Sequence, residues 1–217
     1  TQGNPSAASY IGKPGALSAA SYTLDAATIA THGDDSPGLY HGGVESGSTS
    51  LELSNLDIST VGDNSNAATH IGVRADNSIA AFDALNLTLS TQGDNSAGLM
   101  IVPVLAGLSP SAISGSTLVT SLTSVSVSTS GSGSAGVIIG DAGFYGVSPS
   151  TASSSTFTHD MDFVSVETTG DDADGVIIYG LGVDATDISS NLLLDNMDVT
   201  TSGDRSRGIV VNFGTQG

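Results

Sequence analysis

Apolar and polar residues alternate in short runs along this chain, and each run leads into a threonine. Positions two and four before each of these threonines are apolar, and the residues between them are mostly polar. The threonines are Thr31, Thr60, Thr91, Thr129, Thr168 and Thr201. Alternation with a period of two is typical of a β-strand with one buried face. The pattern therefore predicts a strand before each threonine, whose own side chain points inward and can bond the backbone of the following turn.

Each threonine begins the same motif, Thr-x-Gly-(Asp/Ser)-x-(Ser/Ala)-x-(Gly/Ala), which an apolar residue follows. The motif occupies residues 31–38, 60–67, 91–98, 129–136, 168–175 and 201–208. Degenerate copies stand at residues 1–3 and 215–217. The motif keeps its length, whereas the six full copies are spaced from 29 residues (31 to 60) up to 39 residues (129 to 168) apart. A fixed motif that recurs at such intervals is typical of a solenoid.

A second apolar segment begins directly after the motif. Two consecutive residues are apolar there in most copies, so both faces of this segment are apolar. The pairs are Leu39-Tyr40, Leu99-Met100, Val137-Ile138, Val176-Ile177 and Ile209-Val210. We expect a second strand here, and its outer face is either covered by a neighbouring segment or left as an exposed apolar stripe.

Strand, turn, strand, variable loop and third strand together make one coil of about 30 residues, a usual repeat size. We predict an all-β fold, a single-stranded parallel β-helix (β-solenoid) of about six to seven coils. Residues 1–217 are expected to form one continuous segment of it. Helices are not expected, because Gly, Ser, Thr and Asp dominate the non-apolar positions and no apolar period of 3.6 is sustained.

The motif residues have the chemistry of a tight corner. Glycine at the third and eighth positions predicts positive φ or close backbone approach. Ala67 replaces the eighth glycine once, so we expect a distorted corner between residues 60 and 72. The fourth-position aspartates are expected to accept hydrogen bonds from amides two residues ahead. The alternative is a weak calcium ladder formed by the stacked carboxylates; no other cofactor is expected.

Composition narrows the range of partners. The chain carries 22 acidic residues against 4 Lys and Arg, a formal net charge of −18. Nucleic acid is excluded as a partner because phosphate binding requires basic residues. No apolar run approaches 18 residues, so we expect no membrane insertion by this segment. Cysteine is absent, which excludes disulfides and a thiol nucleophile.

The two longest intervals carry matching insertions. Residues 107–118 and 146–157 align without gaps and stand 39 positions apart (146 − 107), so stacked loops are expected near 103–118 and 142–157. Such loops either bind a ligand or are solvated decoration. The possible ligand-facing residues are Ser109, Phe144, Tyr145 and Ser148. Phe144 and Tyr145 are the best candidates for an aromatic glycan platform.

No enzyme activity is predicted, and no catalytic, cofactor-binding or metal-binding residues are assigned. The histidines lack a metal-ligand spacing and are expected in loops or at the surface; they are His32, His41, His70 and His159. Polysaccharide hydrolysis would need a pair of carboxylates in a groove. Asp57, Asp160, Asp162 and Asp198 are candidates, but their spacing is equally that of a solvated strand face.

Two runs of the sequence resemble a known family. They are Val-Ser-Thr-Ser-Gly-Ser-Gly-Ser-Ala-Gly-Val-Ile (127–138) and Val-Glu-Thr-Thr-Gly-Asp-Asp-Ala-Asp-Gly-Val-Ile (166–177). Both resemble the passenger repeats of bacterial autotransporters, the type V secreted surface proteins. The resemblance implies a right-handed, pectate-lyase-like β-helix displayed outside the cell and attached to the outer membrane through another part of the chain. It implies no catalytic residues.

The first functional hypothesis is therefore an extracellular or surface-displayed structural β-helix that presents loops for adhesion or acts as a spacer. Its partner would be a host cell, a neighbouring cell or a glycan. The alternative is a fibre segment that assembles by end-to-end stacking of β-helices. A polysaccharide-acting enzyme and an ice-binding protein are weaker alternatives, the latter because regular rows of Thr-x-Thr are lacking.

Overall fold

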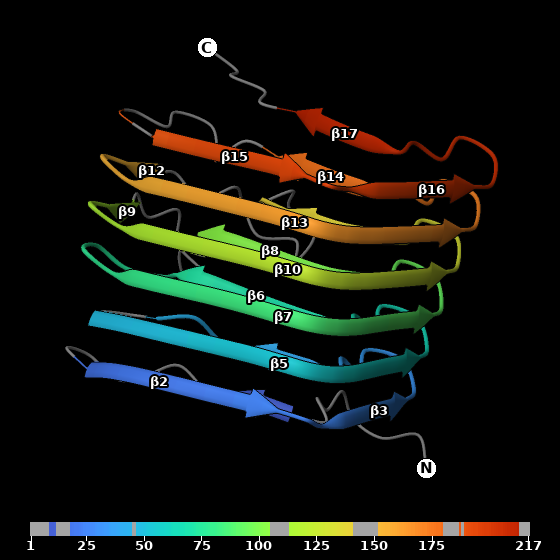
Figure 1. The fold of residues 1–217 in the computed structure, drawn as a ribbon, viewed down its shortest axis with the longest axis horizontal. Coiled ribbons are helices and arrows are strands. Elements are labelled where there is room, and N and C mark those ends of the chain that lie inside the picture. The colour runs from blue at the N-terminus through green and yellow to red at the C-terminus, as the bar shows by residue number, and fades with distance from the viewer. Residues whose placement is uncertain are drawn as a thin grey trace.

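The computed structural model describes residues 9–11, 18–44, 47–104, 113–140, 152–179, 187 and 189–212. This part of the chain contains β-strands and turns and no helix. Two sheets face each other, and all strand pairs in them are parallel (Figure 1). The all-β class predicted from the sequence is confirmed, and the arrangement is consistent with a β-solenoid.

The larger sheet has eight strands in the order β15-β13-β10-β7-β5-β2, with β16 beside β13 and β3 beside β5. Its strands are β2 (Ser18–Asp25), β3 (Thr28–His32), β5 (Gly47–Val61), β7 (Ile79–Gln92), β10 (Thr117–Ser130), β13 (Thr156–Thr169), β15 (Ser189–Asp195) and β16 (Asp198–Ser202). Neighbouring strands pair with the motif threonines opposite one another, for example Thr60 with Thr91 and Thr129 with Thr168. The repeats aligned from the sequence therefore lie directly above one another.

The smaller sheet has seven strands in the order β1-β4-β6-β8-β11-β14-β17. Its strands are β1 (Ser9–Ile11), β4 (Leu39–His41), β6 (Ala68–Val73), β8 (Ala97–Val104), β11 (Ala135–Ile139), β14 (Val176–Tyr179) and β17 (Ile209–Asn212). A third sheet consists of β9 (Ile113–Ser114) and β12 (Ala152–Ser153). The predicted strand after each motif is thus present.

The long strands β5, β7, β10 and β13 bend at one residue with positive φ (Figure 1). The sequence predicted a separate strand on each side of this point. The structure instead joins the two segments through a single residue in the left-handed region, where the alternation of inward and outward side chains slips by one. The column of such residues is Ala26, Asn55, Asn86, Ser124, Phe163 and Asn196. All six are exposed.

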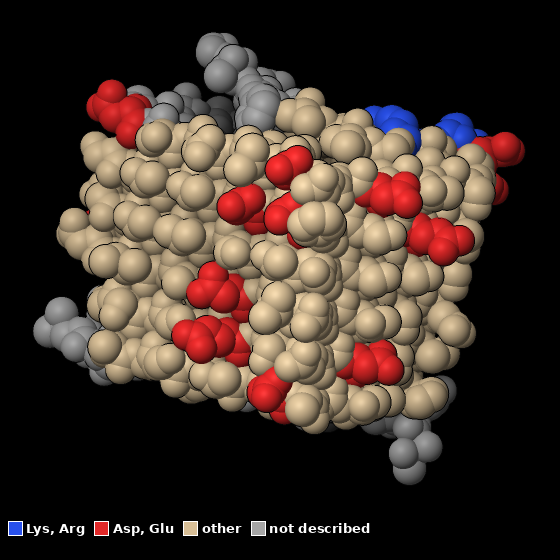
Figure 2. Space-filling model, viewed as in Figure 1, with Lys and Arg blue, Asp and Glu red and all other residues tan. Residues whose placement is uncertain are grey.

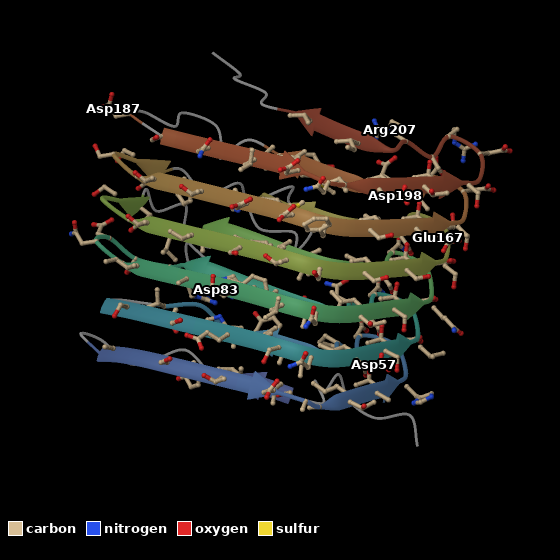
Figure 3. The ribbon with its side chains drawn as sticks, viewed as in Figure 1. Asp57, Asp83, Glu167, Asp187, Asp198 and Arg207 are labelled. Atoms are coloured by element: carbon tan, nitrogen blue, oxygen red, sulfur yellow. The ribbon has the colours of Figure 1, made fainter. Side chains whose placement is uncertain are left out.

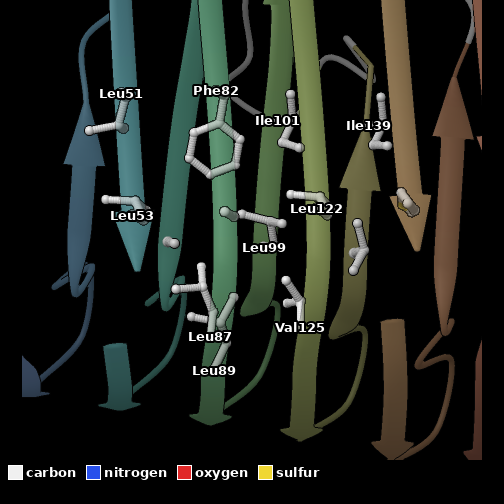
Figure 4. Packing of buried hydrophobic residues seen from close by; sticks show 14 of the residues in the cluster. Leu51, Leu53, Phe82, Leu87, Leu89, Leu99, Ile101, Leu122, Val125 and Ile139 are labelled. Atoms are coloured by element: carbon white, nitrogen blue, oxygen red, sulfur yellow. The ribbon is translucent and has the colours of Figure 1, made fainter. Parts of the chain in front are cut away.

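The hydrophobic core lies between the two sheets. Side chains from both sheets, among them Leu53, Phe82 and Leu99, fill this space (Figure 4). They are fully buried, and burial of one such side chain contributes about 1.5–3 kcal/mol. The motif threonines also point inward, as predicted, since five of the six are buried: Thr31, Thr60, Thr91, Thr129 and Thr168.

The outer face of the smaller sheet is covered. Met100, Ile138 and Ile177 point away from the main core but are only 2–6% exposed, and they belong to a second apolar cluster that includes Ile71. Of the two possibilities that the sequence left open, the covered face is correct and the exposed apolar stripe is wrong.

Candidate functional site

The motif threonine can bond the backbone of the turn that it begins. Thr60 Oγ1 donates to the carbonyl of Ser65 at 2.6 Å, five residues further along. Thr31 and Thr168 make the equivalent bonds to Ser36 and Ala173 at 2.7 and 3.0 Å. In these three repeats the hydroxyl bonds the backbone of the turn, as the sequence predicted. In the described part of the chain, the buried Oγ1 atoms of Thr91 and Thr129 have no such partner, so the prediction is wrong for these two repeats.

The two motif glycines serve different purposes. The third position has positive φ, 142° at Gly62, and a Cβ there would overlap the carbonyl of Gly33 in the preceding repeat. At the eighth position φ is not positive. A Cβ at Gly98 would instead overlap Cγ1 of Val127 in the next repeat. Both reasons predicted for glycine are therefore realised at the third position. The eighth position shows close approach without positive φ, since a Cβ at Gly98 would also lie 2.9 Å from the carbonyl oxygen of Gly136.

Ala67 does not distort its corner. Its amide donates to Ala97 in the next repeat at 3.0 Å, and its carbonyl accepts from Leu39 in the preceding one at 2.9 Å. The other corners bond in the same pattern, so the expected distortion is wrong. The valines and isoleucine against the eighth glycines are β-branched, whereas the equivalent residue after Ala67 is Leu89. Leucine leaves the space that a β-branched methyl group would fill.

The fourth-position aspartates form a ladder between repeats. Asp63 Oδ1 accepts from the amide of Asp94 at 2.8 Å, and Asp94 Oδ1 accepts from Ser132 at 2.8 Å. The predicted acceptance from the amide two residues ahead is therefore wrong. That amide, of Ser65 in the repeat of Asp63, donates instead to Ser96 Oγ in the next repeat at 2.9 Å.

Serine at the sixth position forms a second, buried ladder that the sequence analysis missed. Ser96 Oγ accepts from the amide of Ser65 and donates to the carbonyl of Gly62 at 3.1 Å. Ser134 Oγ likewise accepts from the amide of Ser96 at 3.1 Å and donates to the carbonyl of Gly93 at 2.8 Å. Both hydroxyls satisfy groups in the preceding repeat. The recurrence of serine at a small buried position was the available signal.

The same chemistry recurs at the opposite edge of the sheets, where the chain enters the long strands. Ser114 N donates to Asp76 Oδ1 at 2.8 Å, and the amide of Ser78 donates to Ser116 Oγ at 3.2 Å. The intervening Asn77 has positive φ, as Asn64 does in the motif. Asp76-Asn77-Ser78 repeats Asp63-Asn64-Ser65, a sequence signal that was overlooked. Hydrogen bonds from one repeat to the next therefore line both edges.

The matching insertions meet at this second edge. β9 and β12 pair in parallel, with Ile113 opposite Ala152 and Ser114 opposite Ser153. The returning ends of the two insertions therefore lie side by side. The four predicted ligand-facing residues, Ser109, Phe144, Tyr145 and Ser148, lie outside the described residues.

Three of the four histidines lie in the core. His41, His70 and His159 are at most 4% exposed, which contradicts the surface position predicted for them; His32 is exposed. They occupy inward columns in which other repeats carry apolar residues such as Ile101 and Phe82. In the described part of the chain, no group of three or more His, Asp or Glu side chains is arranged to hold a metal.

The buried histidines contact one another and aromatic rings. The rings of His41 and His70 stack at 4.8 Å with their Nδ1 atoms 3.0 Å apart, and His70 stacks on Phe82 at 4.6 Å. Burial lowers the pKa of His41 and of His159 to about 4. Burial, and then the proximity of His41 and His159, lower the pKa of His70. These side chains are therefore neutral at physiological pH.

Carboxylates lie on the outer face of the larger sheet (Figures 2 and 3). The predicted candidates Asp57, Asp160 and Asp198 are exposed there, and Asp162 is half-buried. Asp83 lies opposite Glu52 on the neighbouring strand, and burial followed by the charge of Glu52 raises its pKa. The carboxylates thus follow exposed strand positions on an open sheet surface.

Comparison with family models, curated proteins and solved structures gave no match for this chain. Among the residues that the structure describes, no helix is long and apolar enough to cross a membrane.

Proposed function

We propose that this chain is a non-catalytic structural β-solenoid, displayed at a bacterial cell surface or outside the cell, that holds loops for adhesion or acts as a spacer. It would be a right-handed, pectate-lyase-like coil of about six to seven turns, of the kind found in autotransporter passengers. The observation that carries the proposal is the hydrogen bonding between repeats along both edges. The aspartate and serine ladders directly link the corners that begin at Thr60, Thr91 and Thr129, and Asp76 and Ser116 make equivalent bonds at the second edge.

These ladders favour a supporting role because they add side-chain bonds to the backbone pairing of the sheets. A typical intramolecular hydrogen bond contributes about 0.5–1.5 kcal/mol, and each corner contains several. Repeat proteins gain stability from such contacts between neighbours. The paired ends of the insertions at Ile113 and Ala152 support the second part of the proposal, that the rod presents loops at a fixed spacing.

The experiment removes the insertions and retains the rod. The repeat that contains Thr60 has no insertion and serves as the template. Its Val73 pairs with Val104, and by the register of the next strands its Ala75 corresponds to Ile113. Arg74 alone therefore stands where the next repeat has residues 105–112. Residues 105–112 and 143–151 are each replaced by one serine. Circular dichroism and a thermal melt should match those of the parent. Attachment of protein-coated beads to host cells, neighbouring cells and glycan arrays should fall to the level of uncoated beads.

Unchanged attachment of the shortened protein would overturn the adhesive role. The spacer role would then be the remaining part of the proposal. Loss of the parallel β spectrum would show that the insertions support the fold. A control shortens one insertion at a time, because ligands that span both loops require both.

End-to-end stacking of β-helices into a fibre is the alternative function. We favour the loop-presenting rod because the ends of the two insertions pair, with Ile113 opposite Ala152.

A further inference from the structure

Phe163 has an unusual position on the outer face of the larger sheet. It is 59% exposed, the most exposed of the large hydrophobic side chains in the described residues. Its φ is 54°, in the left-handed region that a bulky side chain rarely adopts. The equivalent residues in the neighbouring repeats are Ser124 and Asn196, small polar residues that suit an exposed bend. Neither packing nor backbone preference accounts for phenylalanine at this point.

Carboxylates surround this ring on the same face. Asp162 precedes Phe163 on β13, and Asp162 Oδ1 accepts from Asn196 Nδ2 of the next repeat at 2.9 Å. Asp160, Glu167, Asp195 and Asp198 occupy further exposed positions on β13, β15 and β16. Figure 2 shows acidic side chains on both sides of the central ridge of this face, and Figure 3 places Glu167 and Asp198 on one side of it.

Among the described residues, no basic side chain pairs with a carboxylate of this surface. Arg205 and Arg207 lie at the corner that follows β16, where they pair with Asp172 and Asp174. Figure 2 shows blue atoms at the upper edge of the face. The face around Phe163 therefore combines an exposed aromatic ring with a negative field in a chain of net charge −18.

We propose that the outer face of β10, β13 and β15 around Phe163 is a docking surface for a positively charged polypeptide segment. A Lys or Arg side chain of the partner lies over the Phe163 ring, because the face of an aromatic ring attracts cations. Neighbouring basic side chains meet Asp160, Asp162 and Asp198. A neutral glycan would use the ring but not the carboxylates, so the charge favours a basic peptide.

Phe163 lies outside both insertions in the sequence, so the proposal does not depend on the loop-based adhesion above. Removal of residues 105–112 and 143–151 should leave binding at Phe163 unchanged. Each of the two proposals can therefore be refuted without affecting the other.

The test measures binding of a fluorescein-labelled octa-arginine peptide by fluorescence anisotropy. Phe163→Asn introduces the residue that Asn55, Asn86 and Asn196 provide in other repeats. We expect its Kd to rise about threefold or more, as for loss of a cation–π contact. Its melting temperature should equal or exceed that of the parent, because asparagine tolerates positive φ better. Leu85→Thr, at another exposed apolar position of this sheet, should keep Kd within about twofold.

A matched pair of double variants separates this surface from overall charge. Asp160→Asn with Asp198→Asn should raise Kd more than Glu52→Gln with Asp57→Asn, which removes the same charge from the other end of the same sheet. Equal effects of the two pairs, or an unchanged Kd for Phe163→Asn, would overturn the proposal. Binding of a neutral dextran oligosaccharide that depends on Phe163 would overturn it in favour of a glycan site.

Discussion

Gly98 lies against Val127 of the next repeat so closely that a Cβ at Gly98 would overlap Val127 Cγ1. The same relationship joins Gly136 to Val166. Ala67 shows how the fold tolerates a larger residue, because its counterpart to Val127 is the γ-branched Leu89. The chain thus contains both solutions of one packing problem: glycine against a β-branched side chain, and alanine against leucine.

We expect Gly98→Ala to lower the free energy of unfolding by about 1–3 kcal/mol, the usual cost of overpacking a core. Val127→Leu should be mildly destabilising alone. The double variant should be more stable than the sum of the two effects by at least about 1 kcal/mol. Urea unfolding of the four proteins gives this coupling energy. Additivity within about 0.5 kcal/mol would contradict the proposed relationship.

Ser96 bonds the preceding repeat through both its acceptor and its donor function. Ser96→Ala leaves the buried amide of Ser65 and the carbonyl of Gly62 without this partner, so stability should fall by about 1–3 kcal/mol. Ser128→Ala, on the exposed face of β10, is the control and should change stability by less than about 0.5 kcal/mol. Equal effects of the two substitutions in urea unfolding would refute a role for the serine ladder.

Ala173 occupies the serine position of its repeat and offers no hydroxyl to the preceding one. Ala173→Ser restores the side chain found at Ser65, Ser96 and Ser134. We expect about 0.5–1.5 kcal/mol of added stability, the contribution of one hydrogen bond. A lower midpoint in urea unfolding would show that this corner lacks room for the hydroxyl.

The strands before the motif could be predicted because alternation reports burial directly. Leu87 and Leu89 are buried and Thr88 lies between them on the outer face, as the pattern indicated. The bend was missed because one extra residue shifts the alternation. Leu53 and Leu56 both point inward although three positions separate them, and Asn55 between them is the only local sign of positive φ.

The buried histidines were missed because residue type was given more weight than column position. His70 occupies the column of Ile101, Ile139 and Ile178, which alone predicts an inward side chain. The amides that donate to the aspartate side chains could not be predicted in the same way. An amide two residues ahead and the amide one repeat away are equally consistent with the sequence, and only the stacking distance distinguishes them.

Neutral buried histidines make stability depend on pH. The pKa of His159 is about 4 in the folded state and near 6.5 when unfolded. Between these values only the unfolded state binds the proton, so stability falls as pH falls below 6.5. Between pH 7 and pH 5, each such histidine should lower the free energy of unfolding by about 2 kcal/mol. His159→Leu should remove this share of the loss. Parallel profiles for parent and His159→Leu in urea unfolding at both pH values would refute this assignment.

Asp94 accepts a hydrogen bond from the next repeat, and we predict that it does not bind calcium. Its Oδ1 accepts from Ser132 N at 2.8 Å, and an asparagine side chain offers the same oxygen in the same place. Asp94→Asn should therefore keep stability within about 0.5 kcal/mol, whereas Asp94→Ala should cost about 1 kcal/mol. The thermal melt of the parent should be the same in excess calcium and in chelator. A calcium ladder predicts the opposite: a higher melting temperature with calcium that both substitutions abolish.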